Sequence, residues 1–172
     1  MKGILFLLFA LGFSQLYSQD NIFDASRKGN LNEVISIYTK DPGTINQINN
    51  DGYSPLILAC YHGNAEVVEF LIDKVDDINL TSDYGTPLMA AVVKGNIEII
   101  KMLLAKNADT NIAGFNGTTA MHYAVMFRDY EVVKLLIKAN ANLEIKDNRG
   151  QSALDYAALY DDNKLNNLLK NI

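Results

Sequence analysis

Apolar and polar positions recur along this sequence in four similar segments, each marked by a glycine. Gly52, Gly85, Gly117 and Gly150 lie 33, 32 and 33 residues apart. A short, mostly apolar run follows each glycine and ends in alanine, and further apolar residues stand eight and twelve positions after that alanine. A spacing of four residues places side chains on one face of a helix. The pattern therefore predicts a turn, a short helix, a tight loop and a second helix in every segment.

The alanines that close the apolar runs show one irregularity in the repeat. Ala59, Ala91, Ala124 and Ala157 are 32, 33 and 33 residues apart, so the second segment lacks one residue near its turn. Upstream, the stretch 23–31 repeats the alanine-to-glycine half of a segment without the turn. This stretch predicts an N-terminal cap repeat.

The second segment illustrates the signals that begin and end each helix. Thr86 predicts a hydroxyl cap and Pro87 a first helical residue, where proline sacrifices no hydrogen bond. Gly95 ends the first helix, and Asn107 ends the second because asparagine accepts the left-handed conformation. Val75 takes the position of Asn107 in the first segment, and a β-branched residue is rarely left-handed. We therefore expect the backbone after the second helix of that segment to follow another route.

These segments resemble ankyrin repeats in several motifs that recur in register. The motifs are the Thr-Pro-Leu helix start at Thr86, the alanine-to-glycine helix end, the paired apolar residues of the second helix and the Ala-Asp-x-Asn exit at Ala108. The resemblance covers roughly Ile22 to Leu169 and implies an all-α ankyrin-repeat solenoid of helix-turn-helix units joined by hairpin-like β-turn loops. The predicted organisation is a signal peptide over 1–18, an N-terminal cap repeat over 19–48, ankyrin repeats over 49–81, 82–113 and 114–146, and a C-terminal capping repeat over 147–172.

The predicted last repeat has a polar outer face. Asn166 and Asn167 stand where earlier segments carry apolar residues such as Val133. Terminal repeats need a polar outer face to remain soluble. The substitution therefore predicts that this repeat closes the stack.

The first eighteen residues have the outline of a secretory signal peptide. Lys2 precedes an apolar run over 4–13, and a polar stretch with small residues ends at Ser18. A buried helix or a membrane anchor is the alternative, but a span needs about 20 apolar residues. We expect cleavage after Ser18 and a periplasmic or secreted protein. One cysteine, Cys60, fits a bacterial periplasm better than a disulfide-rich extracellular space.

Charge and cysteine content exclude several classes of function. With 20 Asp and Glu against 15 Lys and Arg, the formal charge is −5. Nucleic-acid and anionic-membrane binders need a dense basic surface, so we expect no nucleic-acid partner and no membrane contact after signal removal. Cys60 cannot form an internal disulfide or build a thiolate zinc site by itself.

No catalytic constellation is present in the sequence. His62 has no companion at metal-ligand spacing, and the ankyrin resemblance implies that the ring of His122 ties one turn to the next. The carboxylate pairs Asp76-Asp77 and Asp161-Asp162 fall in expected loops, where solvated charges are ordinary. The chain lacks nucleophile-elbow, Walker, zinc-protease and calcium-loop motifs. We predict no catalytic, cofactor-binding or metal-binding residue.

The ankyrin resemblance implies a concave surface, lined by the first helices and the turn tips, that binds protein partners. Aromatic and large apolar residues collect at these positions, as they do at the centres of interfaces. Val93, Met126 and Leu159 have the alternative role of packing between repeats, whereas Tyr61, Phe127 and Tyr160 are expected outside the inter-repeat core. The predicted partner-binding residues are Tyr53, Tyr61, His62, Tyr84, Lys94, Phe115, Met126, Phe127 and Tyr160.

Three functions compete at this level. The first is a monomeric, secreted, non-enzymatic module that holds one protein partner as an inhibitor, immunity protein or escort of an enzyme. The second is an exported bacterial ankyrin protein that engages a host protein. The third is an unrecognised hydrolase, which no group of residues supports.

Overall fold

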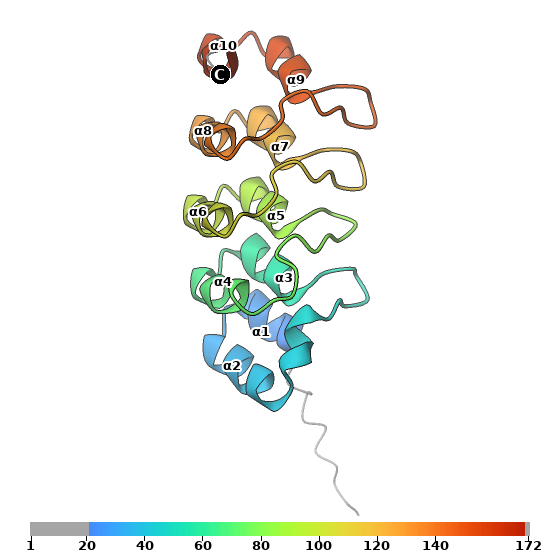
Figure 1. Cartoon of the computed structure of the whole chain (residues 1–172), viewed down its shortest axis with the longest axis vertical. Helices are drawn as coiled ribbons and strands as arrows, with labels where there is room; N and C mark the ends of the chain where they lie inside the picture. The colour runs from blue at the N-terminus through green and yellow to red at the C-terminus, as the bar shows by residue number, and fades with distance from the viewer. Residues whose placement is uncertain (1–20, 171–172) are drawn as a thin grey trace, which may run out of the picture.

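The computed structural model describes residues 21–170, which form ten α-helices and one 3-10 helix (Figure 1). The predicted signal peptide over 1–18 lies outside the described residues. The elements are α1 Ile22–Lys28, α2 Leu31–Lys40, η1 Pro42–Asn46, α3 Pro55–His62, α4 Ala65–Ile72, α5 Pro87–Val93, α6 Ile97–Ala105, α7 Ala120–Met126, α8 Tyr130–Lys138, α9 Ala153–Leu159 and α10 Asn163–Lys170.

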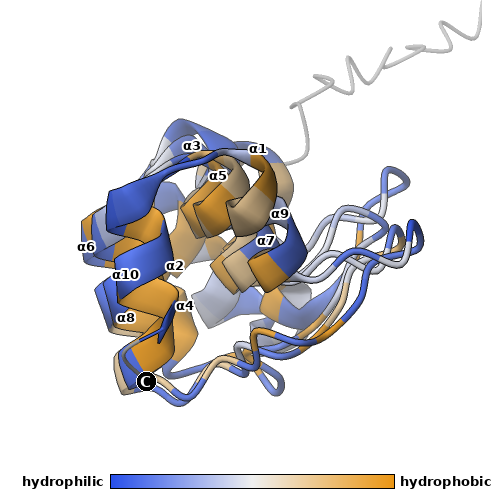
Figure 2. Cartoon of the chain, turned by 90° about the horizontal axis from the view of Figure 1, so that it is seen from above, coloured by the Kyte–Doolittle hydropathy of each residue, from blue (hydrophilic) through white to orange (hydrophobic). Residues whose placement is uncertain are grey.

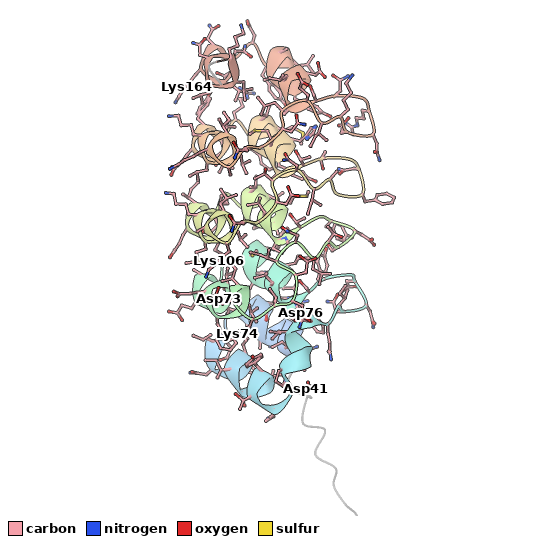
Figure 3. All side chains as sticks on the ribbon, in the orientation of Figure 1. Asp41, Asp73, Lys74, Asp76, Lys106 and Lys164 are labelled. Carbon is pink, nitrogen blue, oxygen red and sulfur yellow. The ribbon has the colours of Figure 1, made fainter. Side chains whose placement is uncertain are left out.

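Consecutive helices pair, and the pairs stack into an elongated solenoid (Figure 1). Helices α1, α3, α5, α7 and α9 form one layer, and α2, α4, α6, α8 and α10 form the other. Long loops project on the side of the first layer, as the view along the stack shows (Figure 2). The predicted all-helical repeat solenoid is confirmed. Within the described residues no helix is long and apolar enough to cross a membrane.

Small residues allow the helices of the first layer to approach one another closely. The five repeated alanines, Ala25, Ala59, Ala91, Ala124 and Ala157, are at most 1% exposed. Between the layers lie the apolar residues of the second helices, Val67, Leu71, Ile99, Leu103, Val132, Leu136, Leu165 and Leu169. Each unit thus buries its apolar faces against its neighbours, which makes the stack nearly one-dimensional in its energetics.

The helix ends confirm the local signals in the sequence. Thr86 Oγ1 accepts a hydrogen bond from the N–H of Met89 at 3.2 Å, and Gly95 ends α5 with a φ of 65°. At the corresponding ends of α7 and α9, Arg128 and Asp161 adopt left-handed φ values of 54° and 49° although they are not glycines. The repeat geometry therefore holds these two residues in a conformation that side chains normally resist.

The backbone near Val75 follows a different route from the other units, as expected. Helix α4 ends at Ile72, Asp73 has a φ of −93°, and the N–H groups of Lys74 and Val75 both donate to the carbonyl of Leu71. Val75 is absent from the residues with positive φ among those described. The chain leaves this helix through a tighter turn, which avoids the left-handed position that asparagine takes elsewhere.

The residue missing from the second unit is missing from its projecting loop. There the N–H of Ser82 donates to the carbonyl of Gly85, three residues on. The corresponding bonds of the other units span four residues, from Asn49 to Tyr53, from Gly114 to Thr118 and from Asp147 to Gln151. The loop absorbs the deletion, so the helices of this unit stay in register.

Asparagine side chains also join successive units, which the sequence analysis did not predict. Asn79 Oδ1 accepts from the backbone N–H of Asp109 at 2.9 Å, and Asn111 Oδ1 accepts from that of Asn142 at 2.7 Å. Asn46, at the end of η1, makes the equivalent bond one unit earlier. These bonds fix the spacing between the exits of the second helices.

The last helix has the two-sided character expected of a cap. Leu165 and Leu169 of α10 are buried, whereas Asn163, Asn167 and Lys170 are exposed. Figure 2 shows this helix largely hydrophilic at the end of the stack.

Candidate protein-binding surface

A groove runs between the first-layer helices and the projecting loops in the N-terminal half of the stack. Its volume is ≈ 430 Å³, and α1, α3, α5 and α7 contribute to its walls together with the first two loops. We call this hollow the hairpin groove and define it by Arg27, Tyr53, Tyr61, His62, Tyr84 and Tyr123. Aromatic and aliphatic side chains make up most of its lining.

Two aromatic pairs build the walls of the hairpin groove. The rings of Tyr53 and Tyr84, from neighbouring loops, stack with centroids 5.1 Å apart and an angle of 14° between their planes. The rings of Tyr61 and His62 meet edge to face at 5.3 Å, and Lys94 Nζ lies 4.6 Å from the centroid of Tyr61. Stacking and cation–π contacts hold these side chains in defined orientations.

The surroundings of His62 favour its neutral form. Partial burial lowers the pKa of the imidazole first, and the positive charges of Arg27 and Lys94 lower it further. Burial beside Tyr84 raises the pKa of the Tyr53 hydroxyl in the same groove. A further positive charge beside His62 is therefore unfavourable.

A second aromatic surface continues along the first layer toward the C-terminus. Tyr123 and Phe127 stack at 6.3 Å, and the guanidinium carbon of Arg128 lies 5.0 Å from the centroid of Tyr160. Phe127 is 56% exposed and Leu159 71% exposed. Since single apolar residues at a surface are ordinary, the informative feature is their continuity with the hairpin groove.

The structure places the sequence-predicted residues at different depths. Six of the predicted residues are exposed: the aromatic Tyr61, Tyr84, Phe115 and Phe127, and the basic His62 and Lys94. Tyr53, Met126 and Tyr160 are half-buried. The expectation that Tyr160 lies outside the inter-repeat core is wrong, because its ring packs against the core beneath Arg128.

Tyr123 lines the groove but is missing from the residues predicted from sequence. It precedes Ala124, whereas the prediction considered mainly residues that follow the repeated alanines. Its spacing of four residues from Phe127 places both on one helix face. That spacing was the available signal for including it.

His122 has the structural role that the ankyrin resemblance implied. It is buried, its Nδ1 accepts from the backbone N–H of Thr119 at 3.0 Å, and its Nε2 lies 3.2 Å from the carbonyl oxygen of Gln151 in the next loop. Because Nδ1 accepts from an N–H, the ring proton is on Nε2 and is donated to Gln151. The ring thus joins two successive units.

Other candidate reactive groups also have structural surroundings. Asp162 accepts hydrogen bonds from the N–H of Leu165 and the hydroxyl of Tyr130, and these bonds lower the pKa of its carboxyl. Cys60 is buried, and burial raises the pKa of its thiol. Across residues 21–170 no three His, Cys, Asp or Glu side chains form a group that could hold a metal ion.

Comparison with known proteins identifies the family. A family model described as ankyrin repeats in three copies matches residues 22–114 and 111–172. The chain therefore belongs to the ankyrin repeat family, which is typically a non-enzymatic protein-interaction module.

Curated relatives match this chain over a short segment. Over 59 residues, 34% of this chain, the identity is 39% to "Ankyrin repeat and SAM domain-containing protein 6" of Rattus norvegicus and 37% to that of Mus musculus. The matched segment covers 7% of each of these two relatives. The likeness therefore concerns the repeats, which mark the chain as a protein-binding module.

Proposed function

We propose that this protein is a monomeric, exported binding module that holds one protein partner on the concave face of its first-layer helices and loops. Within that role we favour an inhibitor, an immunity protein or an escort of an enzyme. The continuous row of exposed aromatic residues carries the proposal, because aromatic side chains dominate the centres of protein interfaces. Tyr61, Tyr84 and Phe127, from successive units, are 43%, 68% and 56% exposed.

The dimensions of the stack suit a partner of ordinary interface size. Five helices about 10 Å apart give a surface about 40 Å long. A surface of that length can contribute about 800 Å² to a complex, which is a standard interface share. The module thus offers enough area to hold a folded partner.

Alanine substitution of exposed aromatic residues tests this function. Tyr61→Ala and Phe127→Ala are expected to weaken partner binding by about 2 kcal/mol each while the melting temperature changes little. Tyr160 is unsuitable for this test since it packs against the core. The measurement is capture of proteins from periplasmic extract by the mature chain, followed by mass spectrometry and titration of the captured protein.

Matched controls lie on the second-layer helices. Glu98 and Lys134 are exposed on α6 and α8, so Glu98→Ala and Lys134→Ala should retain the same captured protein. A protein captured equally by the Tyr61 and Phe127 variants would contradict binding through the concave face. The same bait in a host-cell extract tests the alternative of host engagement.

We expect the protein to be exported and its first eighteen residues to be removed. If residues 1–18 are a cleaved signal, mass spectrometry of the protein recovered from cells should find Gln19 at or near the N-terminus. The protein should also fractionate with the periplasm or the medium, because the apolar run over 4–13 is too short to remain as a membrane span. Recovery of the full-length chain in the cytosol would contradict export.

A further inference from the structure

Three basic side chains lie in or beside the hairpin groove although the chain as a whole has a formal charge of −5. Arg27, His62 and Lys94 stand at the C-terminal ends of three successive first-layer helices, α1, α3 and α5. Cations at helix C-termini are favourable in any protein, so their position alone does not indicate a ligand. The feature that indicates a ligand is the arrangement of these groups around a partly desolvated aromatic hollow.

Two of the three basic groups contact one aromatic ring, and the third acts on one of those two. Lys94 Nζ lies over the ring of Tyr61, the same ring meets the edge of His62, and the charge of Arg27 acts on His62. Arg27, Tyr61 and His62 all line the hairpin groove. The positive charges therefore converge on one place instead of being spread over the surface.

Three acidic groups lie near this place, one on α1 and two in the loops. Asp24 is bonded to Arg27 with an N to O distance of 2.5 Å, and it cancels one charge. Asp51 and Asp83 are exposed beside Tyr53 and Tyr84 in the loops. On the helix side of the groove, Arg27, Lys94 and Asp24 leave one net positive charge, and Asp51 and Asp83 stand apart from them in the loops. A carboxylate placed there would gain the attraction that a partly water-excluded site strengthens.

We propose that the partner enters the hairpin groove with an acidic segment, whose Asp or Glu carboxylate lies among Arg27, His62 and Lys94. A neighbouring apolar side chain of that segment packs against the Tyr53–Tyr84 pair. This inference rests on the proposed function and adds the chemistry of the partner. The net negative charge of the chain repels a polyanion, whereas a locally acidic protein segment meets mainly the charges within a Debye length of about 8 Å.

Selection from a displayed library of random peptides, about a dozen residues long, tests the proposal directly. The full mature chain serves as bait, and the Tyr61→Ala variant as counter-bait. Peptides that depend on Tyr61 should be enriched in Asp or Glu beside an aromatic or aliphatic residue. Tyr61-dependent peptides without an acidic excess would overturn the acidic-segment inference and leave the groove as a binding site. Selection of no Tyr61-dependent peptide would contradict both.

A matched pair of charge reversals then measures the electrostatic part. Lys94→Glu and Lys134→Glu change the net charge equally, but Lys134 lies on α8 in the other layer. Against the best selected peptide, Lys94→Glu should weaken binding about tenfold or more, and Lys134→Glu less than about twofold. Replacing the peptide's carboxylates by amides should give a similar loss. Equal affinities for the Lys94 and Lys134 variants would overturn the proposal.

The pH dependence of peptide affinity gives a readout that a structural effect would not produce. The pKa of His62 is lowered in the free protein, and a bound carboxylate would raise it, so binding takes up a proton. Affinity should therefore rise about threefold from about pH 7.5 to about pH 6, and His62→Gln should abolish the rise. Arg27 and Lys94 are the charged groups that act on His62, and Asp24 is paired with Arg27; the His62→Gln variant leaves all three in place. Affinity that is flat or falls with acidification would count against the placement of the carboxylate beside His62.

Discussion

Deleting residues 148–172 is expected to leave a chain that aggregates or melts about 10–20 °C lower than the parent. The deletion removes α9 and α10, which pack on α7 and α8. It uncovers Val133, which is 0% exposed in the complete stack, and the half-buried Ile137. Burial of each aliphatic side chain contributes about 1.5–3 kcal/mol, so uncovering several removes about 5 kcal/mol from a domain whose net stability is about 5–15 kcal/mol.

A second truncated variant distinguishes the loss of a polar cap from the mere shortening of the chain. Asn166 and Lys170 of α10 correspond to Val133 and Ile137 of α8. Introducing Val133→Asn and Ile137→Lys into the shortened chain should restore its solubility, because the new terminal helix then has a polar outer face. The comparison is by circular dichroism melting and size-exclusion chromatography. An unmodified truncation that stays soluble and melts like the parent would show that α9 and α10 do not cap the stack.

Replacing His122 by alanine is expected to destabilise the protein by about 3 kcal/mol, which lowers the melting temperature by about 6–12 °C. The substitution leaves a cavity at a fully buried position and removes the acceptor for the N–H of Thr119, which is itself buried. It also removes the bond to the carbonyl of Gln151 in the next unit. Urea denaturation followed by circular dichroism measures the free energy of unfolding.

His62→Ala is the control for this substitution. His62 is exposed at the end of α3, so its loss should change the free energy of unfolding by no more than about 0.5 kcal/mol. A His122→Ala variant within about 1 kcal/mol of the parent would mean that the hydrogen bonds of His122 do not hold the units together. A large loss of stability in His122→Ala together with almost none in His62→Ala would confirm that His122 is structural and that His62 belongs to the surface.

The repeat fold was predictable because its signals are local and recur in register. A hydroxyl before proline, as at Thr86, and a left-handed asparagine, as at Asn107, define helix ends within a few residues of chain. The absence of a left-handed conformation at Val75 could be inferred from its β-branched side chain alone. Repetition then adds the long-range information, since residues one period apart must be neighbours in a stack.

The residues of the candidate surface were only partly predictable. Their register on the first helices follows from the repeated alanines, and it correctly places Tyr61, Phe127 and Lys94 at exposed positions. Tyr123 was missed although its spacing from Phe127 was visible. Tyr160 was placed too far from the core because a period says which face a residue is on and not what covers it.

The sequence by itself determined the pair of helices in each of the four repeats, most of their ends, and the unit that lost a residue. The ankyrin resemblance implied the histidine that joins two turns. The tertiary structure decided how the loops lie over the first-layer helices and therefore which side chains meet there. The stack of Tyr53 on Tyr84, the contact of Arg128 with the ring of Tyr160, and the contact of Lys94 with the ring of Tyr61 all join different units. Such contacts depend on the rise and rotation from one unit to the next, and side-chain packing between units sets these quantities instead of any local signal in the chain.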